Sequence, residues 1–282
     1  MPELPEVETM CRGIAGVVGL PIAAVDFARR TRRPLTIEPA AGRLAGRLVG
    51  RRIAAISRAG KRVVLQLDLE SQTGAERLVI EPRMTGLLLR VPPPSETHVR
   101  MTMHFAAAVP PLIFWDRRGL GTIRLLAAAD FARRCGPPAV GPDSLTLRGP
   151  ELATAIRGSR RSIKQALLDQ RVTAGIGNIY AAEILFAAGI DPRSRCCRLS
   201  RDACAAIAAA GRSILRRAIR LEGSSIGDET YRTADSRPGR YQRCHQVYGR
   251  ADQACFRCGA AIRRIIQAQR STFFCPGCQR RR

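Results

Sequence analysis

Four cysteines near the C-terminal end impose the strongest constraint on how this chain can fold. They form two pairs, Cys255-x2-Cys258 and Cys275-x2-Cys278, separated by 16 residues. Two such pairs can place four thiolates on a tetrahedron about 2.3 Å from a Zn²⁺ ion. All four ligand positions are then filled by protein, so the expected zinc is structural, with no open position for a substrate. We therefore predict a small ribbon folded by one Zn²⁺ ion, and we interpret the other six cysteines as packing residues.

The charge of the chain is far from balanced. Its 282 residues include 47 lysines and arginines against 23 acids, a formal net charge of +24. Such a charge favours a polyanionic partner, and nucleic acid is the first candidate. The apolar stretches are too short for a membrane helix, and the first residues lack the basic and apolar regions of a secretory signal. We therefore expect a cytoplasmic protein that binds no membrane.

Only two of the basic residues are lysines, Lys61 and Lys164. A coding bias explains the excess of arginine, and two lysines can survive such a bias by chance. An amine, however, can lose a proton at physiological pH, whereas a guanidinium cannot. Both lysines are therefore candidates for positions at which an amine is needed.

The chain has a strand-rich part followed by a helix-rich part. Alternating or continuous apolar runs predict strands over residues 62–69, 77–80, 86–91, 99–105 and 112–116. Helical periodicity predicts helices over residues 3–19, 161–170, 178–188 and 200–221, the last with Ser200 as N-cap. Glycines and prolines at 136–142 mark a linker between the two parts. The pattern predicts an α+β fold with two domains, the first an antiparallel β-sandwich with an N-terminal helix.

The residue after the initiator methionine is Pro2, and Glu3 follows it. A small second residue generally allows the methionine to be removed, which leaves a secondary amine at the N-terminus. An α-amino group with a pKa of about 8 is partly neutral at neutral pH and can attack an aldehyde carbon to form an iminium ion. The carboxyl group of Glu3 can then donate or relay a proton. The alternative is that these residues only begin a helix, because proline and acids favour the first turn.

Four segments resemble the bacterial formamidopyrimidine-DNA glycosylases, in the order found in that family. They are MPELPEVET at 1–9, GIGNIYA at 175–181, QVYGR at 246–250 and QRSTFFC at 269–275. The matches run from the first residue to the zinc ligands, so the resemblance covers essentially the whole chain. The LPEVE opening separates the chain from the endonuclease VIII branch, which typically begins with PEGP.

The resemblance implies a fold and a set of domains. It implies a β-sandwich catalytic domain over residues 1–135, a linker over 136–142 and a helix–two-turn–helix domain over 143–240. The last 42 residues, 241–282, would form the zinc-finger β-hairpin. Within the helical domain, the loop 223–240 occupies the position of the family's lesion-sensing loop, and its Gly, Ser, Asp and Arg content predicts mobility.

The resemblance also implies roles for four catalytic residues. Pro2 would be the nucleophile at C1′ of the damaged nucleotide, and Glu3 the acid that helps to open the sugar ring. Lys61 matches a lysine assigned to proton transfer and phosphate contact. Arg270 matches the finger arginine that grips phosphates and donates a proton in δ-elimination. Glu6 and Glu183 match family acids with less defined roles.

Further matches imply contacts with DNA. When the damaged base leaves the stack, the protein must fill the void. Met84 matches the void-filling methionine, Arg118 the arginine that pairs with the orphaned cytosine, and Leu120 occupies the position of a phenylalanine wedge. The alternative for Met84 and Leu120 is ordinary packing. The remaining DNA-contact candidates are Arg160, Lys164 and Asn178, with Asn178 at a helix N-terminus that suits a phosphate.

Some residues depart from the family pattern. Leu120 lacks the aromatic ring of the usual wedge, and Glu96 replaces a histidine that contacts phosphate. Arg117 and Gly119 replace a proline and an arginine, so a looser loop is expected around Arg118. Lesion preference is not readable from the loop 223–240.

We therefore predict a monomeric, bifunctional DNA glycosylase and abasic-site lyase of base-excision repair, acting on oxidised purines in double-stranded DNA without a nucleotide cofactor. The same chemistry directed at oxidised pyrimidines is the closest alternative. A non-catalytic zinc-finger protein that binds damaged DNA is a second alternative, since the charge and the finger would suit it equally. The amino terminus distinguishes an enzyme from a protein that only binds DNA, because a binding module has no use for Pro2 beside Glu3.

Overall fold

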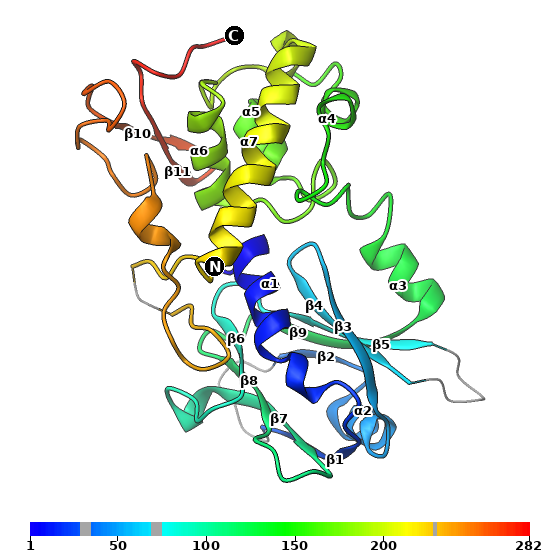
Figure 1. The fold of residues 1–282 in the computed structure, drawn as a ribbon. Helices are drawn as coiled ribbons and strands as arrows, with labels where there is room; N and C mark the ends of the chain where they lie inside the picture. Colours follow the sequence, from blue (N-terminus) through cyan, green and yellow to red (C-terminus); the bar gives the residue numbers. More distant parts are fainter. Residues whose placement is uncertain (29–34, 69–74, 228–229) are drawn as a thin grey trace. The chain divides into compact units, whose positions relative to one another are not determined.

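The computed structural model describes residues 1–28, 35–68, 75–227 and 230–282, and these residues form two compact units (Figure 1). Unit 1 comprises Met1–Cys135 together with Leu221–Arg240, and unit 2 comprises Gly136–Arg220 together with Tyr241–Arg282. The boundary after Cys135 lies where the linker was predicted to begin. Residues 221–240, which follow the helices in sequence, pack as part of unit 1, and the finger residues share a unit with the helices.

Two β-sheets form the body of unit 1. The first sheet has the order β1-β7-β8-β6, with bounds Ile22–Phe27, Val99–Phe105, Leu112–Asp116 and Gly86–Leu89. The second has the order β2-β9-β5-β4-β3, with bounds Thr36–Glu38, Thr122–Ala127, Glu76–Glu81, Arg62–Leu67 and Ile53–Ala59. Neighbouring strands are antiparallel except for the parallel pair β2 and β9.

One hydrophobic core joins the two sheets of unit 1. It contains Met103 and Phe114 from the first sheet, Leu65 and Ile80 from the second, and Val7 from helix α1 (Leu4–Gly13). Alternation along β4 and β7 sends every second side chain into this core, which is why the two periodic runs predicted strands correctly. Helices α2 (Ala41–Leu48) and α3 (Ala128–Cys135) complete the unit.

The structure corrects several predicted boundaries in unit 1. The first helix ends at Gly13, and a separate 3₁₀ turn follows at Ala15–Val17. Strands β1, β3 and β9 were not predicted, because small or charged residues interrupt their apolar pattern. The predicted end of β4 at residue 69 lies outside the described residues.

The segment Leu221–Arg240 is fastened to unit 1 by buried groups. Tyr231 and Ala234 belong to the core, and the N–H of Arg90 donates to the carbonyl of Ala234 at 2.9 Å. Ser224 and Ser225 are also buried. Several described residues of the segment predicted as a mobile loop are thus buried in unit 1, while residues 228–229 lie outside the described residues.

Four α-helices and one β-hairpin make up the regular structure described for unit 2. The helices are α4 (Gly149–Ala155), α5 (Ile163–Leu168), α6 (Asn178–Ala187) and α7 (Arg201–Arg220). The hairpin pairs β10 (Arg263–Gln267) with β11 (Arg270–Phe274). The hydroxyl of Ser200 accepts the N–H of Ala203 at 3.2 Å, as predicted for an N-cap. Within the described ranges, no helix is long and apolar enough to cross a membrane.

A buried carboxylate attaches the finger segment to α6. Glu183 is 1% exposed and accepts the backbone N–H groups of Gln246, Val247 and Tyr248 at 2.8, 3.0 and 2.8 Å. Burial raises the pKa of this carboxyl group, while the three N–H groups act in the opposite direction. Because its acceptors are satisfied by consecutive backbone donors, Glu183 fixes the path of the chain as it enters the finger.

A series of aromatic rings continues this attachment. Tyr180, Tyr241, His245, Tyr248 and Phe273 follow one another with ring centroids 5.1–5.7 Å apart. These spacings suit edge-to-face packing. The series runs from α6 to strand β11, so the hairpin and the helix share one packed layer.

Burial lowers the pKa of His245 from 6.5 to about 4. A neutral histidine in the folded state contributes stability that is complete above pH 6.5 and is lost as the pH falls toward 4. We expect the free energy of the opening that exposes His245, measured by hydrogen exchange of residues 245–248, to fall by about 2 kcal/mol between pH 7 and pH 5. In the variant His245→Gln, whose side chain cannot be protonated, this free energy should fall by less over the same pH range. An equal fall in both proteins would show that protonation of His245 is not its cause.

Candidate functional site

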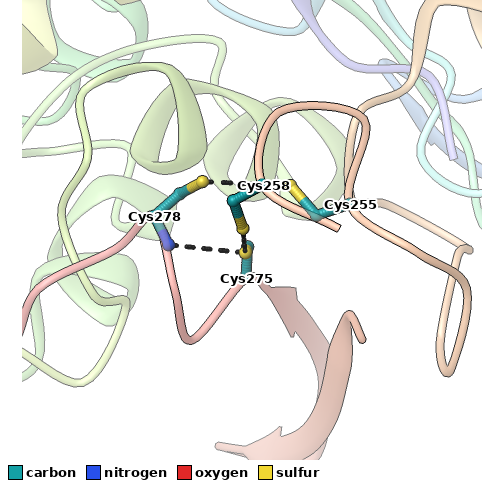
Figure 2. A group of neighbouring side chains, drawn as sticks. All are labelled: Cys255, Cys258, Cys275 and Cys278. Atoms are coloured by element: carbon teal, nitrogen blue, oxygen red, sulfur yellow. Dashed lines mark hydrogen bonds between the residues drawn. The ribbon is translucent and has the colours of Figure 1, made fainter. Parts of the chain in front are cut away.

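The four predicted zinc ligands meet at one point in unit 2 (Figure 2). Their sulfur atoms all lie within 4.8 Å of one another, with Cys258 Sγ 3.4 Å from Cys275 Sγ and Cys255 Sγ 3.9 Å from Cys278 Sγ. Sulfur atoms bound to one tetrahedral zinc ion lie about 3.8 Å apart. The cluster therefore fits a single Zn²⁺ ion.

Backbone geometry supports this donor set. The N–H of Arg257 donates to Cys255 Sγ and the N–H of Cys278 donates to Cys275 Sγ, both at 3.4 Å. Burial opposes ionisation of Cys255, but the N–H groups of Arg257 and Cys258 and the thiols of Cys275 and Cys278 lower its pKa to about 7. When bound, zinc joins the two knuckles at the base of the β10–β11 hairpin, and the chain leaves it no open coordination position.

The predicted nucleophile and its neighbouring acid lie at the start of α1. Pro2 and Glu3 are buried, and Met1 is 41% exposed. Glu6 is 1% exposed and accepts the N–H of Glu3 on Oε2 at 2.9 Å. The carboxylate of Glu6 therefore fixes the backbone of the residue next to Pro2.

The same carboxylate fixes the segment Leu221–Arg240. Its Oε1 accepts the N–H of Ser224 at 2.8 Å. Gly223 has φ 78°, and a Cβ atom there would lie 2.6 Å from Glu6 Oε1, so glycine is required for this approach. Glu6 thus binds the amino terminus on one oxygen and the predicted lesion-sensing loop on the other.

Lys61 lies at the tip of the β3–β4 hairpin. The turn pairs Ala59 with Arg62, and Gly60 occupies the first central position with φ 59°, as a type II′ turn requires. The hairpin packs on α1, where Arg58 Nε donates to Glu8 Oε2 at 3.2 Å and Cys11 Sγ donates to the carbonyl of Ser57 at 3.3 Å. These contacts fix the lysine turn relative to the helix that begins beside Pro2.

Met84, Arg118 and Leu120 lie on two loops that share one buried clamp. The carboxylate of Asp116, which is 0% exposed, accepts the N–H groups of Gly121 at 2.8 Å and Arg118 at 3.2 Å. The hydroxyl of Thr85 donates to the same carboxylate and accepts the N–H of Arg118 at 2.9 Å. The loop around Arg118 is therefore fixed by side-chain acceptors, despite the departures that predicted a looser backbone.

The clamp leaves the tips of these loops exposed. Met84 is 37% exposed and Leu120 is 39% exposed. The side chain of Arg118 is also exposed. Two apolar tips and one guanidinium thus project from neighbouring rigid loops of unit 1.

In unit 2, a glutamine organises the turn before α6. Gln170 accepts the N–H of Gly175 on Oε1 at 2.8 Å and donates from Nε2 to the carbonyl of Ile176 at 3.0 Å. Asn178 is the first residue of α6, as predicted. Its Nδ2 donates to the carbonyl of Ser271 in β11 at 3.0 Å.

Lys164 is almost completely buried, at 1% exposed. Its Nζ donates to the carbonyl of Ser271 at 3.0 Å and to Thr272 Oγ1 at 2.6 Å. Asn178 and Lys164 therefore converge on one carbonyl of β11. The expected direct contact of this lysine with DNA is not supported, because the ammonium faces the hairpin rather than solvent.

Arg270 begins β11, directly after a two-residue turn. Both turn residues, Ala268 and Gln269, have positive φ values, 46° and 60°, which are unfavourable for residues other than glycine. The side chain of Arg270 is exposed and lines a hollow of about 410 Å³ with Arg161, Gln165 and Asp169. Arg160 is exposed on the loop between α4 and α5. The strained turn and the buried lysine together determine where Arg270 is presented.

Three residues that position the site were missed by the sequence interpretation. They are Thr85, Asp116 and Gln170. Asp116 had a usable signal, since a lone acid at the end of an apolar strand and before a Gly-containing loop favours capping of that loop. Thr85 and Gln170 carry no comparable local signal.

Comparison with known proteins gives matches along the whole chain. Family models match residues 1–123 (formamidopyrimidine-DNA glycosylase N-terminal domain), 139–230 (formamidopyrimidine-DNA glycosylase H2TH domain) and 252–281 (zinc finger found in FPG and IleRS). The formamidopyrimidine-DNA glycosylase of Solibacter usitatus is 37% identical, with 100% of both chains covered. That of Chloroflexus aggregans is 40% identical, covering 99% of this chain and 98% of the relative.

Solved structures agree with these matches. A Lactococcus lactis FPG mutant in complex with Fapy-dG-containing DNA has a TM-score of 0.86 at 34% identity, covering 99% of this chain and 100% of the other. The MutM (FPG) protein of Thermus thermophilus has a TM-score of 0.83 at 33% identity, covering 99% of this chain and 98% of the other.

Replacing one zinc ligand should unfold the finger. We expect Cys258→Ser to release most of the zinc, because binding of structural zinc supplies on the order of 10 kcal/mol to such small ribbons. Metal analysis should show well under one zinc per chain, and affinity for DNA should fall. The control is Cys197→Ser, an exposed cysteine outside the cluster, which should keep its zinc. Full zinc occupancy in Cys258→Ser would contradict the assignment.

Removing the buried ammonium should loosen the hairpin without releasing zinc. In Lys164→Met, Thr272 Oγ1 and the carbonyl of Ser271 lose a charged donor, which costs roughly 1–3 kcal/mol locally. We expect faster hydrogen exchange in β10 and β11, with zinc content unchanged. The matched control is Lys61→Met, the other lysine, which should not alter exchange in the hairpin. Equal exchange in both variants would show that Lys164 does not hold β11.

Proposed function

Since the chain belongs to the formamidopyrimidine-DNA glycosylase family over its whole length, we propose that it is a bifunctional DNA glycosylase and abasic-site lyase of base-excision repair. The observation that carries the proposal is the attachment of the amino terminus. The buried carboxylate of Glu6 holds the N–H of Glu3, so the residue next to Pro2 has a fixed backbone. This bond is also the capping box with which α1 begins, so the placement of Pro2 beside Glu3, and not the bond alone, distinguishes the proposal from a protein that only binds DNA.

The chemistry begins at the nitrogen of Pro2 after Met1 has been removed. This secondary amine attacks C1′ of the damaged nucleotide, and the bond from C1′ to the base breaks. Glu3 supplies a proton to the sugar-ring oxygen as the ring opens, which leaves a Schiff base between C1′ and Pro2. Loss of a proton from C2′ then expels the 3′ phosphate by β-elimination, and δ-elimination expels the 5′ phosphate. Lys61 and Arg270 serve these proton transfers and contact the phosphates.

Unit 1 also carries the residues that replace the extruded base. Met84 and Leu120 are exposed apolar tips on clamped loops, suited to enter the gap in the base stack. Arg118 pairs with the base left opposite the gap, since its guanidinium is exposed and its backbone N–H is held by Thr85. Leucine at position 120 gives up the stacking of an aromatic ring, worth roughly 1–3 kcal/mol per base.

Unit 2 supplies contacts with phosphates. Arg270 and Arg160 present exposed guanidinium groups, and Asn178 opens α6, where backbone N–H groups favour an anion. Lys164 contributes through the hairpin, because its ammonium donates to Ser271 and Thr272 beside Arg270. In this proposal Lys164 positions Arg270 and does not touch DNA.

The substrate is double-stranded DNA with an oxidised purine, either 8-oxoguanine or formamidopyrimidine. The complex of a Lactococcus lactis FPG mutant with Fapy-dG-containing DNA supports this class. A second Lactococcus lactis FPG complex contains an oxidised pyrimidine in DNA, which keeps pyrimidine lesions as the second candidate. A monomer in contact with the bacterial nucleoid is the state that goes with this function, and no nucleotide cofactor is required.

Borohydride trapping tests the catalytic assignment. We expect the protein to form a covalent adduct with duplexes that contain 8-oxoguanine or an abasic site, and mass spectrometry to locate the adduct on Pro2. In Pro2→Gly the ring that fixes the nitrogen is lost, so strand cleavage should fall about tenfold or more while abasic-site binding stays near that of the wild type. A duplex with an oxidised pyrimidine compares the two lesion classes.

The control variant is Arg12→Gln, on the same helix but with an exposed guanidinium that pairs with Glu8 and leaves the Glu8–Arg58 contact in place. It should cleave nearly as well as the wild type. Undiminished cleavage in Pro2→Gly would remove Pro2 from the mechanism. Absence of any adduct, in protein that has lost Met1 and holds zinc, would leave the non-catalytic DNA-binding protein as the better account.

A further inference from the structure

A second group of arginines gathers in unit 2, apart from Arg270. Arg195, Arg198, Arg281 and Arg282 line one hollow of about 360 Å³. All four side chains are exposed. Within the described part of the chain, none of the four guanidinium groups forms a hydrogen bond or an ion pair. The only acid in the segment 189–198, Asp191, is buried and binds Arg193 at 2.6 Å.

The backbone beneath these arginines is firmly held. The tail runs along the segment after α6, where the N–H of Arg280 donates to the carbonyl of Gly189 and the N–H of Asp191 donates to the carbonyl of Arg280, both at 3.0 Å. The N–H of Arg282 donates to Ser194 Oγ at 2.9 Å. The buried side chain of Gln279 donates to the carbonyl of Ile190 at 2.8 Å. The hollow is therefore lined from two segments whose relative position is fixed.

The other side of the hollow is held in the same way. The backbone of Arg195 forms an isolated antiparallel β-bridge with Ser162. The N–H of Cys196 donates to the carbonyl of Arg161 at 3.0 Å, and the N–H of Cys197 donates to the carbonyl of Ser159 at 2.9 Å. Arg161 itself points to the hollow of Arg270, where it binds Asp169 at 3.0 Å. The segment 159–162 thus contributes Arg161 to one hollow and contacts the backbone of residues 195–197 beside the other.

Four unpaired guanidinium groups around one hollow repel one another, and a polyanion removes that repulsion. Planar guanidinium forks match the oxygens of phosphate groups. We propose that this four-arginine hollow is a second phosphate-binding site, which takes backbone phosphates of DNA beyond those held by Arg270. The phosphates come either from the flank of the damaged duplex or from a second duplex segment.

The test is the variant Arg195→Ala/Arg198→Ala/Arg281→Ala, measured against a control of equal charge. The control is Arg12→Ala/Arg133→Ala/Arg148→Ala, in which each arginine pairs with an acid, Glu8, Asp130 or Glu151. Affinity is measured over a range of salt concentrations with abasic-site duplexes of about one and about three helical turns. A mobility-shift assay with two short duplexes tests for a complex that contains both.

Three neutralised phosphate contacts contribute a slope of about 2–3 in log affinity against log salt concentration. If the flank occupies the hollow, the triple variant loses this slope and about tenfold or more in affinity on the long duplex only. If a second segment occupies it, the wild type forms the complex with two duplexes and the triple variant does not. Single-turnover cleavage of the short duplex should be unchanged in either case.

Equal affinities, salt slopes and two-duplex complexes in the triple variant and the control would overturn the proposal. The proposal rests on DNA as the substrate, but the two can fail separately. If the proposed function fails, the wild type and both variants alike form no borohydride-trapped adduct with the abasic-site duplex. If only the second site fails, all three proteins bind it equally well.

Discussion

Three buried carboxylates, Glu6, Asp116 and Glu183, fix the loops on which the functional residues of this protein depend. Each is at most 1% exposed. Each accepts backbone N–H groups from residues in a loop or at the end of a helix or strand. A buried carboxylate is tolerated only when its oxygens are satisfied, so the loop and the acid require one another. The amino terminus, the apolar tips and the finger are thereby fixed in position without belonging to long regular elements.

The surface of the protein carries exposed arginines that these buried acids do not neutralise. Because several of the 23 acidic residues are buried as acceptors for backbone groups, they cannot neutralise nearby arginines. With 47 basic and 23 acidic residues, many arginines have no acid partner in any case, and among the described residues the exposed guanidinium groups of Arg195, Arg198 and Arg270 have none. The net charge of +24 is therefore concentrated where a polyanion can reach it. Interior architecture and attraction for nucleic acid follow from the same distribution of a small number of carboxylates.

The sequence was sufficient for those parts of the molecule that depend on local spacing. The Cys-x-x-Cys pairs predicted the metal cluster. Strict alternation predicted β7, and a continuous apolar run predicted β8, each with the bounds that the structure shows. Contacts between distant residues were not predictable. Nothing near Lys164 indicates that its amine lies against Ser271, 107 positions away, and nothing near Glu6 indicates Ser224. The packing of 221–240 in unit 1 depends on such pairs, which is why it could not be predicted from the sequence.

The burial of Lys164 has a consequence for chemical modification of the protein. The chain contains two lysines, and the amine of one is enclosed by Ser271 and Thr272 at 1% exposure. Acylating or cross-linking reagents that attack side-chain amines therefore find Lys61, at the tip of the β3–β4 hairpin, as the accessible lysine. Such reagents usually distribute over many surface sites of a protein this basic. Here a single lysine, on the hairpin that packs against α1, would carry the label.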